Sequence, residues 1–367
     1  MKRPARVAAL ASTAVVGLAL AVACLGSGCA SAGYYLQSVQ GHLALVGSTR
    51  PVSDWLADPA TAPALKEQLL LSQRMRDFAV RELKQPDNAS YRRYADLKRR
   101  AAVWNVVAAP ELDLTLRTWC FMVVGCVSYR GYFDKAEAEA FAARLRTEGL
   151  EASVYGVTAY STLGMLPGER FADPLLNTFI GQPEGELARL VFHELAHQVA
   201  FAAGDTEFNE SFATAVEQIG GQRWLSAHGG EAARSEDAGA IARRRDFREL
   251  TLRYRAQLDR VYRSDRPEAE KRDAKVALFR AMRDEHARIR QERWDGFAGY
   301  DGWFERANNA TLGMLAAYHG LVPDFLQLYE RQGSDFERFY AQVRSLARLR
   351  DAQERRAALS AALKAAP

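Results

Sequence analysis

The sequence places two histidines and a glutamate at a spacing that could bind and use a metal ion. His193 and His197 are four residues apart, with Glu194 between them. On a helix, residues at this spacing share one face, so both imidazoles could coordinate one Zn²⁺ ion. Glu194 lies about 100° around the helix from His193, within reach of a water molecule on the metal. In this H-E-x-x-H pattern the glutamate serves as the general base of a metalloprotease.

The alternative is a structural helix in which this pattern occurs by chance, and two features argue against it. The flanking residues are strongly apolar, so we expect the helix to be buried. Buried imidazoles and carboxylates need polar partners, and a metal ion would supply them. The chain also contains only six histidines, so abundance does not easily explain a pair at this spacing.

We expect a third zinc ligand in the helix that follows. The acidic candidates are Asp205, Glu207, Glu210 and Glu217. A turn at the glycine that precedes Asp205 should fold a helix over 205–220 back against a helix over 184–204. Glu210 and Glu217 then lie level with the two histidines, so either could be the ligand. The other two candidates would be solvated caps at the corner.

The strings "HELAHQ" and "NESFATAVE" resemble the gluzincin metallopeptidases. The resemblance implies that His193, His197 and Glu210 are the zinc ligands and that Glu194 is the base. Glu217 would then orient His193 through its other ring nitrogen. Two departures stand out. The interval between His197 and Glu210 is shorter than in the aminopeptidases of that group, and the G-x-M-E-N segment that holds a substrate's free amine there is missing.

A longer resemblance covers almost the whole chain. It is carried by "PDNASYRRYADL", "VWNVVAAPE", "TWCFMVVGCVSYRGYF", "AYSTLG", "DPLL", "FHELAHQ" and "GDTEFNESFATAVE". These strings are similar to a bacterial family known as predicted aminopeptidases, whose members are exported, often as lipoproteins. The resemblance implies a peptide substrate. A second electrophile is usual at such a site; Tyr160, Tyr318 and His319 are candidates, and simple packing is the alternative for each.

The first residues predict export. Residues 1–6 are basic, residues 7–25 are almost wholly apolar or small, and "GSGC" then ends at Cys29. Cleavage before Cys29 would free its thiol for lipidation and anchor the chain to a membrane. Ordinary secretion and an uncleaved N-terminal anchor are the alternatives. Ala30 and Ser31 give no acidic retention signal, so in a host with two membranes we expect the periplasmic face of the outer membrane.

Cys120 and Cys126 form a candidate disulfide. They are the two cysteines that remain beyond the N-terminal segment. In an oxidising compartment such a pair usually forms a disulfide. The intervening residues, which include Gly125, could form a hairpin-like loop that brings the sulfur atoms together. A metal role is less favoured because no histidine lies near the pair in sequence.

The periodicity along the chain predicts an α+β protein, mostly helical, with a small β-sheet before the histidine helix. Helical patterns cover 51–100 and 134–149, and strands are expected within 103–132 and 151–164. The expected regions are a signal peptide at 1–28, a lipid tether at 29–50, a zincin-like catalytic region at 51–232 and a charged helical region at 233–367.

Composition narrows the possible functions. The chain of 367 residues is 48% hydrophobic and 26% charged, which is ordinary for a globular protein. Its net charge of +4 gives no electrostatic case for nucleic acid. We expect a zinc-dependent peptide hydrolase; the alternative is a non-catalytic envelope lipoprotein with a structural or vestigial metal site that binds a partner. Glu194 favours the enzyme, because a structural zinc site needs no base. The oligomeric state stays open.

Overall fold

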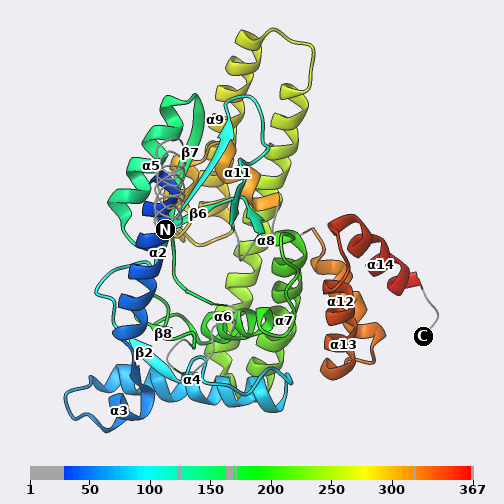
Figure 1. Cartoon of the computed structure of the whole chain (residues 1–367). Helices are drawn as coiled ribbons and strands as arrows, with labels where there is room; N and C mark the ends of the chain where they lie inside the picture. The colour runs from blue at the N-terminus through cyan, green and yellow to red at the C-terminus, as the bar shows by residue number, and fades with distance from the viewer. Residues whose placement is uncertain (1–28, 122–124, 163–168, 170–171, 317–319, 365–367) are drawn as a thin grey trace, which may run out of the picture. The chain divides into compact units, whose positions relative to one another are not determined.

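The computed structural model describes residues 29–121, 125–162, 169, 172–316 and 320–364 (Figure 1). The chain divides into two compact units, Met1–Gly47 and Ser48–Pro367. The first unit contains helix α2, Cys29–Gly47, so most of the segment expected to be a tether is helical. The expected signal peptide, residues 1–28, lies outside the described residues. No helix in the described part combines the length and the apolar character needed to cross a bilayer.

The second unit begins with a small sheet and two helices. In chain order the elements are β1 (Arg50–Pro51), α3 (Val52–Ala57), α4 (Pro63–Arg81), β2 (Arg93–Ala95) and, after a long interval, β8 (Leu175–Leu176). Strand β2 pairs antiparallel with β1 and parallel with β8. Pro63 suits the first position of α4 because its φ is already helical. The helical pattern expected over 51–100 therefore holds for α3 and α4, and the rest is loop and strand.

A second sheet has the strand order β6-β3-β7, with antiparallel pairing throughout. Its strands are β3 (Val103–Pro110), β6 (Arg130–Tyr132) and β7 (Leu150–Val157). Both α5 (Lys135–Thr147) and α11 (Asn309–Ala316) pack against β3. Residues 105–109 are consecutively buried, which explains why this strand is apolar on both faces. The strands expected within 103–132 and 151–164 are confirmed.

The remaining long elements are helices. They are α6 (Glu184–His197), α7 (Thr206–His228), α8 (Glu231–Tyr262), α9 (Glu268–Glu292), α10 (Asp301–Arg306), α12 (Val322–Arg331), α13 (Phe336–Ala347) and α14 (Ala352–Lys364). Helices α6 and α7 pack together extensively, and α8 and α9 form a long hairpin (Figure 1). The predicted fold class, mostly helical α+β with small sheets, is confirmed. The charged region from residue 233 onward belongs to the same compact unit as the residues from 48.

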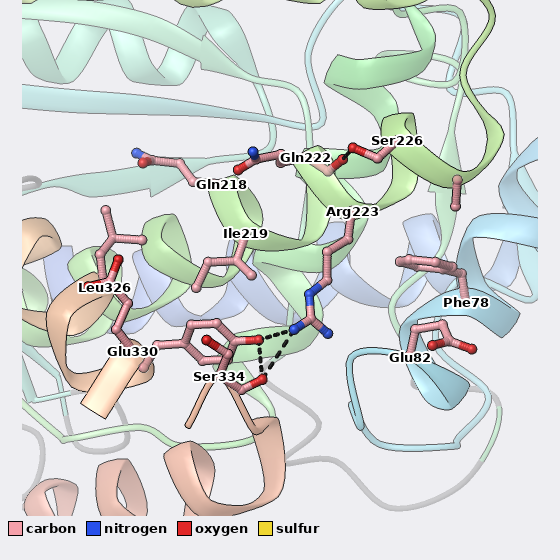
Figure 2. A pocket seen from close by; sticks show the side chains of 12 residues that line it. Phe78, Glu82, Gln218, Ile219, Gln222, Arg223, Ser226, Leu326, Glu330 and Ser334 are labelled. Atoms are coloured by element: carbon pink, nitrogen blue, oxygen red, sulfur yellow. Dashed lines mark hydrogen bonds between the residues drawn. The ribbon is translucent and has the colours of Figure 1, made fainter. Parts of the chain in front are cut away.

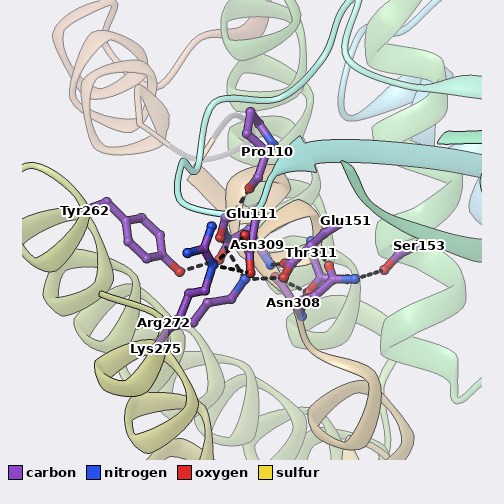
Figure 3. Close-up of polar contacts among 10 residues, drawn as sticks. All are labelled: Pro110, Glu111, Glu151, Ser153, Tyr262, Arg272, Lys275, Asn308, Asn309 and Thr311. Carbon is purple, nitrogen blue, oxygen red and sulfur yellow. Dashed lines mark hydrogen bonds and ion pairs between the residues drawn. The ribbon is translucent and has the colours of Figure 1, made fainter. Parts of the chain in front are cut away.

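A buried polar cluster joins the α8–α9 hairpin to the end of β3 (Figure 3). Asn309 is its centre and is 0% exposed. Its amide donates to the carbonyl oxygens of Pro110 at 3.0 Å and Glu111 at 2.7 Å, and its own oxygen accepts from the Tyr262 hydroxyl at 2.8 Å. Lys275 of α9 also donates to the Glu111 carbonyl, at 2.7 Å. These contacts give the charged hairpin a specific docking position.

Asn309→Ala should destabilise the fold strongly. It leaves the carbonyls of Pro110 and Glu111 and the Tyr262 hydroxyl without a shared partner, and each buried unsatisfied group costs about 1–3 kcal/mol. We expect the free energy of unfolding in urea to fall by about 3–5 kcal/mol. Arg272→Ala is the control, because Arg272 pairs with Glu111 at the surface and should matter little. Equal effects of the two substitutions would contradict the assignment of Asn309 as the centre.

Candidate metal centre

The two histidines lie in the second half of α6, whose apolar side anchors them. Leu187, Val191 and Leu195 are fully buried, so the face that carries His193 and His197 is fixed relative to the core. We expected this helix to continue to Gly204, but it ends at His197. The second histidine is therefore the last residue of the helix, and the chain turns directly after it.

Asn209 explains this early end. Its side-chain oxygen accepts from the backbone N–H of Ala202 at 2.7 Å, and its amide donates to the Ala202 carbonyl at 2.8 Å. These bonds satisfy the backbone N–H and carbonyl of Ala202, within the non-helical link between α6 and α7. Asn209 directly precedes Glu210, so the same residue that closes the link also fixes the first turn of α7.

Asp205 also shapes this corner. Its carboxylate accepts from the Phe208 N–H at 3.1 Å and thereby caps α7, as expected. The expectation that it is solvated is wrong, because Asp205 is only 5% exposed. Arg355, far away in sequence, reaches it and balances its charge at 2.7 Å.

The two histidine side chains point their Nε2 atoms at each other. These atoms are 3.2 Å apart. Nitrogen ligands that each lie about 2.0–2.1 Å from a tetrahedral zinc ion would be separated by about 3.3 Å. The spacing of the two imidazoles therefore fits a shared zinc ion.

Glu210 of α7 completes the cluster. One carboxylate oxygen lies 3.4 Å from His193 Nε2, and the other lies 3.8 Å from His197 Nε2. Potential ligand atoms of these three residues all lie within 4.8 Å of one another, and no other group of this kind occurs within the described ranges. Two imidazoles and one carboxylate are a donor set suited to zinc, with room for a further ligand. The structure thus brings together the three residues named as ligands from the sequence.

Glu217 lies on the opposite side of the His193 ring. Its carboxylate accepts from His193 Nδ1 at 2.8 Å. This contact holds the ring and directs its Nε2 toward His197 and Glu210. A carboxylate bound to the remote nitrogen of a ligating histidine also fixes the tautomer and raises its basicity. Glu217 is therefore placed to orient a ligand, whereas Glu210 is placed to be one.

The two imidazoles have opposite electrostatic environments. Burial lowers the pKa of His197 to about 4, so this ring is neutral near neutral pH and has a free lone pair. Burial also acts to lower the pKa of His193, but hydrogen bonds to Glu210 and Glu217 outweigh it and raise this pKa well above its ordinary value. The carboxylates thus attract positive charge to the position where a metal ion would sit.

Glu194 has the properties of a general base. Burial raises its pKa to about 7, and the nearby charge of His193 opposes this shift. A base is most effective when its pKa lies near the working pH. A dication held by the adjacent ligands would pull this pKa downward, toward the ionised form.

Gln198 ties the end of α6 to a segment far away in sequence. Its amide donates to Ser90 Oγ at 3.1 Å and to Asp173 at 2.9 Å, while its oxygen accepts from Asn88 at 2.7 Å. Arg76, fully buried, donates to the Ser90 carbonyl at 3.0 Å. The sequence alone did not predict these supporting residues. Their signal was that "NAS", the first residue of "DPLL" and the last residue of "HELAHQ" lie in the strings that resemble the family.

Of the candidate electrophiles, Tyr160 packs its ring against Phe133, with 5.3 Å between centroids. Tyr318 and His319 lie outside the described residues. Tyr91, which we did not single out, has a left-handed backbone with φ 63°. Burial, and then the charge of Glu194, raise the pKa of its hydroxyl well above the ordinary value. Tyr91 is thus a neutral donor in the electrostatic neighbourhood of Glu194.

Strands β4 (Trp119–Phe121) and β5 (Gly125–Val127) form a hairpin that contacts the corner between α6 and α7. The sulfur atoms of Cys120 and Cys126 are bonded at 1.99 Å. Gly125 has a φ of 75°, and a Cβ atom there would lie 3.2 Å from the Gly204 nitrogen. The cross-linked hairpin therefore packs closely against the corner backbone, and this contact requires glycine.

Protein isolated from its native compartment should resist alkylation at Cys120 and Cys126 until it is reduced. The bond should contribute on the order of 2 kcal/mol, because it closes a short loop. Mass spectrometry of peptides alkylated before and after reduction measures this directly, with the reduced sample as the positive control. Labelling of both thiols without reductant would rule out the disulfide in that compartment.

A cavity of about 890 Å³ lies against α7 at residues other than the metal-site group (Figure 2). Arg223 projects into it and donates to the Tyr329 hydroxyl and to the Ser334 carbonyl. Gln218 and Gln222 of α7 also line it, but His193, His197 and Glu210 do not. This cavity is therefore separate from the candidate metal centre.

The packed helices α6 and α7 therefore carry a site lined by two histidines and a glutamate. The family described as "Putative aminopeptidase" matches residues 33–359, and the chain belongs to this family. No match was found among curated proteins or among solved structures.

Proposed function

We propose that this protein is a zinc-dependent peptide hydrolase of the aminopeptidase type. The observation that carries the proposal is the convergence of His193, His197 and Glu210 on one point, with Glu194 on the adjacent part of the helix. Membership of the aminopeptidase family supports a peptide substrate. Retention of a glutamate that has no ligand role favours catalysis over a purely structural metal site.

The residues of the chain would divide the chemistry among them. Zinc held by the two histidines and Glu210 would polarise the substrate carbonyl and make a water proton easier to remove. Glu194 would accept that proton as the water attacks the carbonyl and would then deliver it to the leaving amine. Glu217 would keep the His193 ring in its ligating orientation through the 2.8 Å contact at Nδ1. Asn209 would hold Glu210 at the start of α7.

Metal analysis and a peptide-release assay on the same preparation test the proposal. Purified protein should contain about one zinc per chain and release the first residue of an unblocked peptide. A peptide with a blocked N-terminus is the matched control, because an aminopeptidase should leave it intact. Chelation should abolish release, and added zinc should restore it. Zinc binding without any release would instead favour the non-catalytic lipoprotein with a structural metal site. Failure to bind zinc would reject the zinc hydrolase and leave only the lipoprotein with a vestigial site.

We also propose that Cys29 carries lipid and anchors the protein in the bacterial envelope, on the periplasmic face of the outer membrane in a host with two membranes. The support is the basic and apolar leader followed by small residues and this cysteine. Cys29→Ser should leave the protein unprocessed or move it to the soluble fraction, as judged by membrane fractionation and intact mass. Cys24→Ser, within the leader, is the control. Unchanged processing and fractionation of Cys29→Ser would remove the lipid anchor from consideration.

A further inference from the structure

The C-terminal helix α14 reaches the corner that carries the candidate zinc ligand. Arg355 of α14 is 4% exposed, and its Nε donates to Asp205 at 2.7 Å. Its Nη1 donates to the Leu349 carbonyl, also at 2.7 Å. Both partners of the ion pair are almost completely buried, with side chains 5% and 4% exposed. A buried ion pair tolerates little displacement, because removal of one partner leaves an uncompensated charge.

Asp205 connects this ion pair to the first turn of α7. One of its oxygens faces Arg355, and the other accepts from the Phe208 N–H. The backbone carbonyl of Asp205 accepts from the Asn209 N–H at 3.1 Å. The Asn209 side chain hydrogen-bonds both the N–H and the carbonyl of Ala202. The chain of contacts therefore runs from Arg355 through Asp205 to the residue directly before Glu210.

Aromatic packing holds the C-terminal helices against the same turn. Phe208 and Phe212 of α7 contact Phe325 of α12, with ring centroids 5.2 Å and 5.8 Å apart. Phe212 also contacts Phe339 of α13 at 5.8 Å. The apolar contacts bring the helices together, and the Arg355–Asp205 pair adds a directional contact at the corner itself.

We propose that Arg355 is a positioning residue for the metal centre, acting through Asp205 to fix Glu210. The inference rests on the proposed zinc site. It assigns the end of the chain a role in that site, although residues 352–364 are otherwise an ordinary surface helix with two buried residues. Without the guanidinium, Asp205 would lose its directional contact with α14, and the first turn of α7 would lose its fixed position.

Arg355→Met tests the proposal, because methionine keeps much of the apolar stem and removes the charge and the hydrogen bonds. Zinc affinity, measured by competition with a chelator, should weaken about 10–100-fold, as is usual when a group that supports a ligand is lost. The matched control is Arg356→Met in the same turn. Arg356 also pairs with an acidic residue of α7, Glu207, but the Arg356 side chain is 46% exposed. Zinc affinity should therefore hardly change in Arg356→Met.

Two further variants separate positioning from general destabilisation. Lys275→Met breaks the ion pair between Lys275 and Glu151, and neither residue belongs to the metal cluster. This variant should lower the unfolding temperature without weakening zinc affinity. In Asp205→Asn combined with Arg355→Met, both charges are removed while Asn still caps α7. Zinc affinity of this double variant should stay low, because the directional contact is still missing.

Three results would overturn the inference. These are wild-type zinc affinity in Arg355→Met, restored affinity in the double variant, or a loss in Lys275→Met as large as in Arg355→Met. Failure of the wild-type protein to bind zinc would reject the proposed function itself. Tight zinc binding by both the wild type and Arg355→Met would reject only the role of Arg355.

Discussion

Glu194→Gln should bind zinc as tightly as the wild-type protein and lose about 10²- to 10⁴-fold in the rate of peptide hydrolysis. Glutamine has the same shape as glutamate but cannot accept the proton. Glu194 is not a member of the three-residue group whose ligand atoms converge, so its loss should leave the metal in place. Metal content and initial rates of peptide release, measured on the same sample, test both halves of this expectation.

Glu207→Gln is the appropriate control for this experiment. Glu207 is also an acidic residue near the corner, but it pairs with Arg356. In the described part of the chain it makes no contact with His193 or His197. Its substitution should leave both zinc content and hydrolysis close to wild type. Normal hydrolysis by Glu194→Gln would mean that another group removes the proton, and loss of zinc would mean that Glu194 contributes to binding.

Glu210→Ala should release zinc at chelator concentrations that Glu217→Ala survives. Glu210 faces the Nε2 atoms of both histidines, so its removal deletes a proposed ligand. Glu217 contacts only the remote nitrogen of His193, and loss of such a partner typically weakens metal binding about 10–100-fold. Chelator titrations followed by metal analysis would rank the two variants.

The outcome of that ranking is informative in each direction. The reverse order would move the ligand role from Glu210 to Glu217. A double variant, His193→Ala with His197→Ala, should contain no zinc at all. Full zinc content in this double variant would end the metallopeptidase proposal, because no other convergent group of ligands occurs in the described part of the chain.

The relative placement of these residues could be predicted because it depends on local periodicity. His193 and His197 are one helical turn apart, and Glu210 and Glu217 are about two turns apart, so each pair shares a face. The mostly helical α+β class followed from the same periodicities and is confirmed. The end of α6 could not be predicted. It depends on the Asn209 side chain, which binds the backbone of Ala202 in place of a continued helix.

The residues that support the site could not be predicted for a different reason. Gln198 and Asn88 are separated by 110 residues, and Arg355 and Asp205 by 150. No periodicity links residues so far apart. Arg355 is also one of 49 basic residues, and an arginine in a charged helix normally indicates a solvated face. Only the three-dimensional packing of α14 shows that this arginine is buried.

The contact between Gly125 and Gly204 has a consequence for when the proposed site would become active. The hairpin that carries Gly125 is closed by the bond between Cys120 and Cys126, and it packs against the corner that precedes Glu210. We expect the corner to be fully ordered only after the hairpin is closed. A chain still in the reducing cytoplasm would then have an immature site. Maturation would then follow the proposed export, and cytoplasmic peptides would be spared hydrolysis by the proposed peptidase.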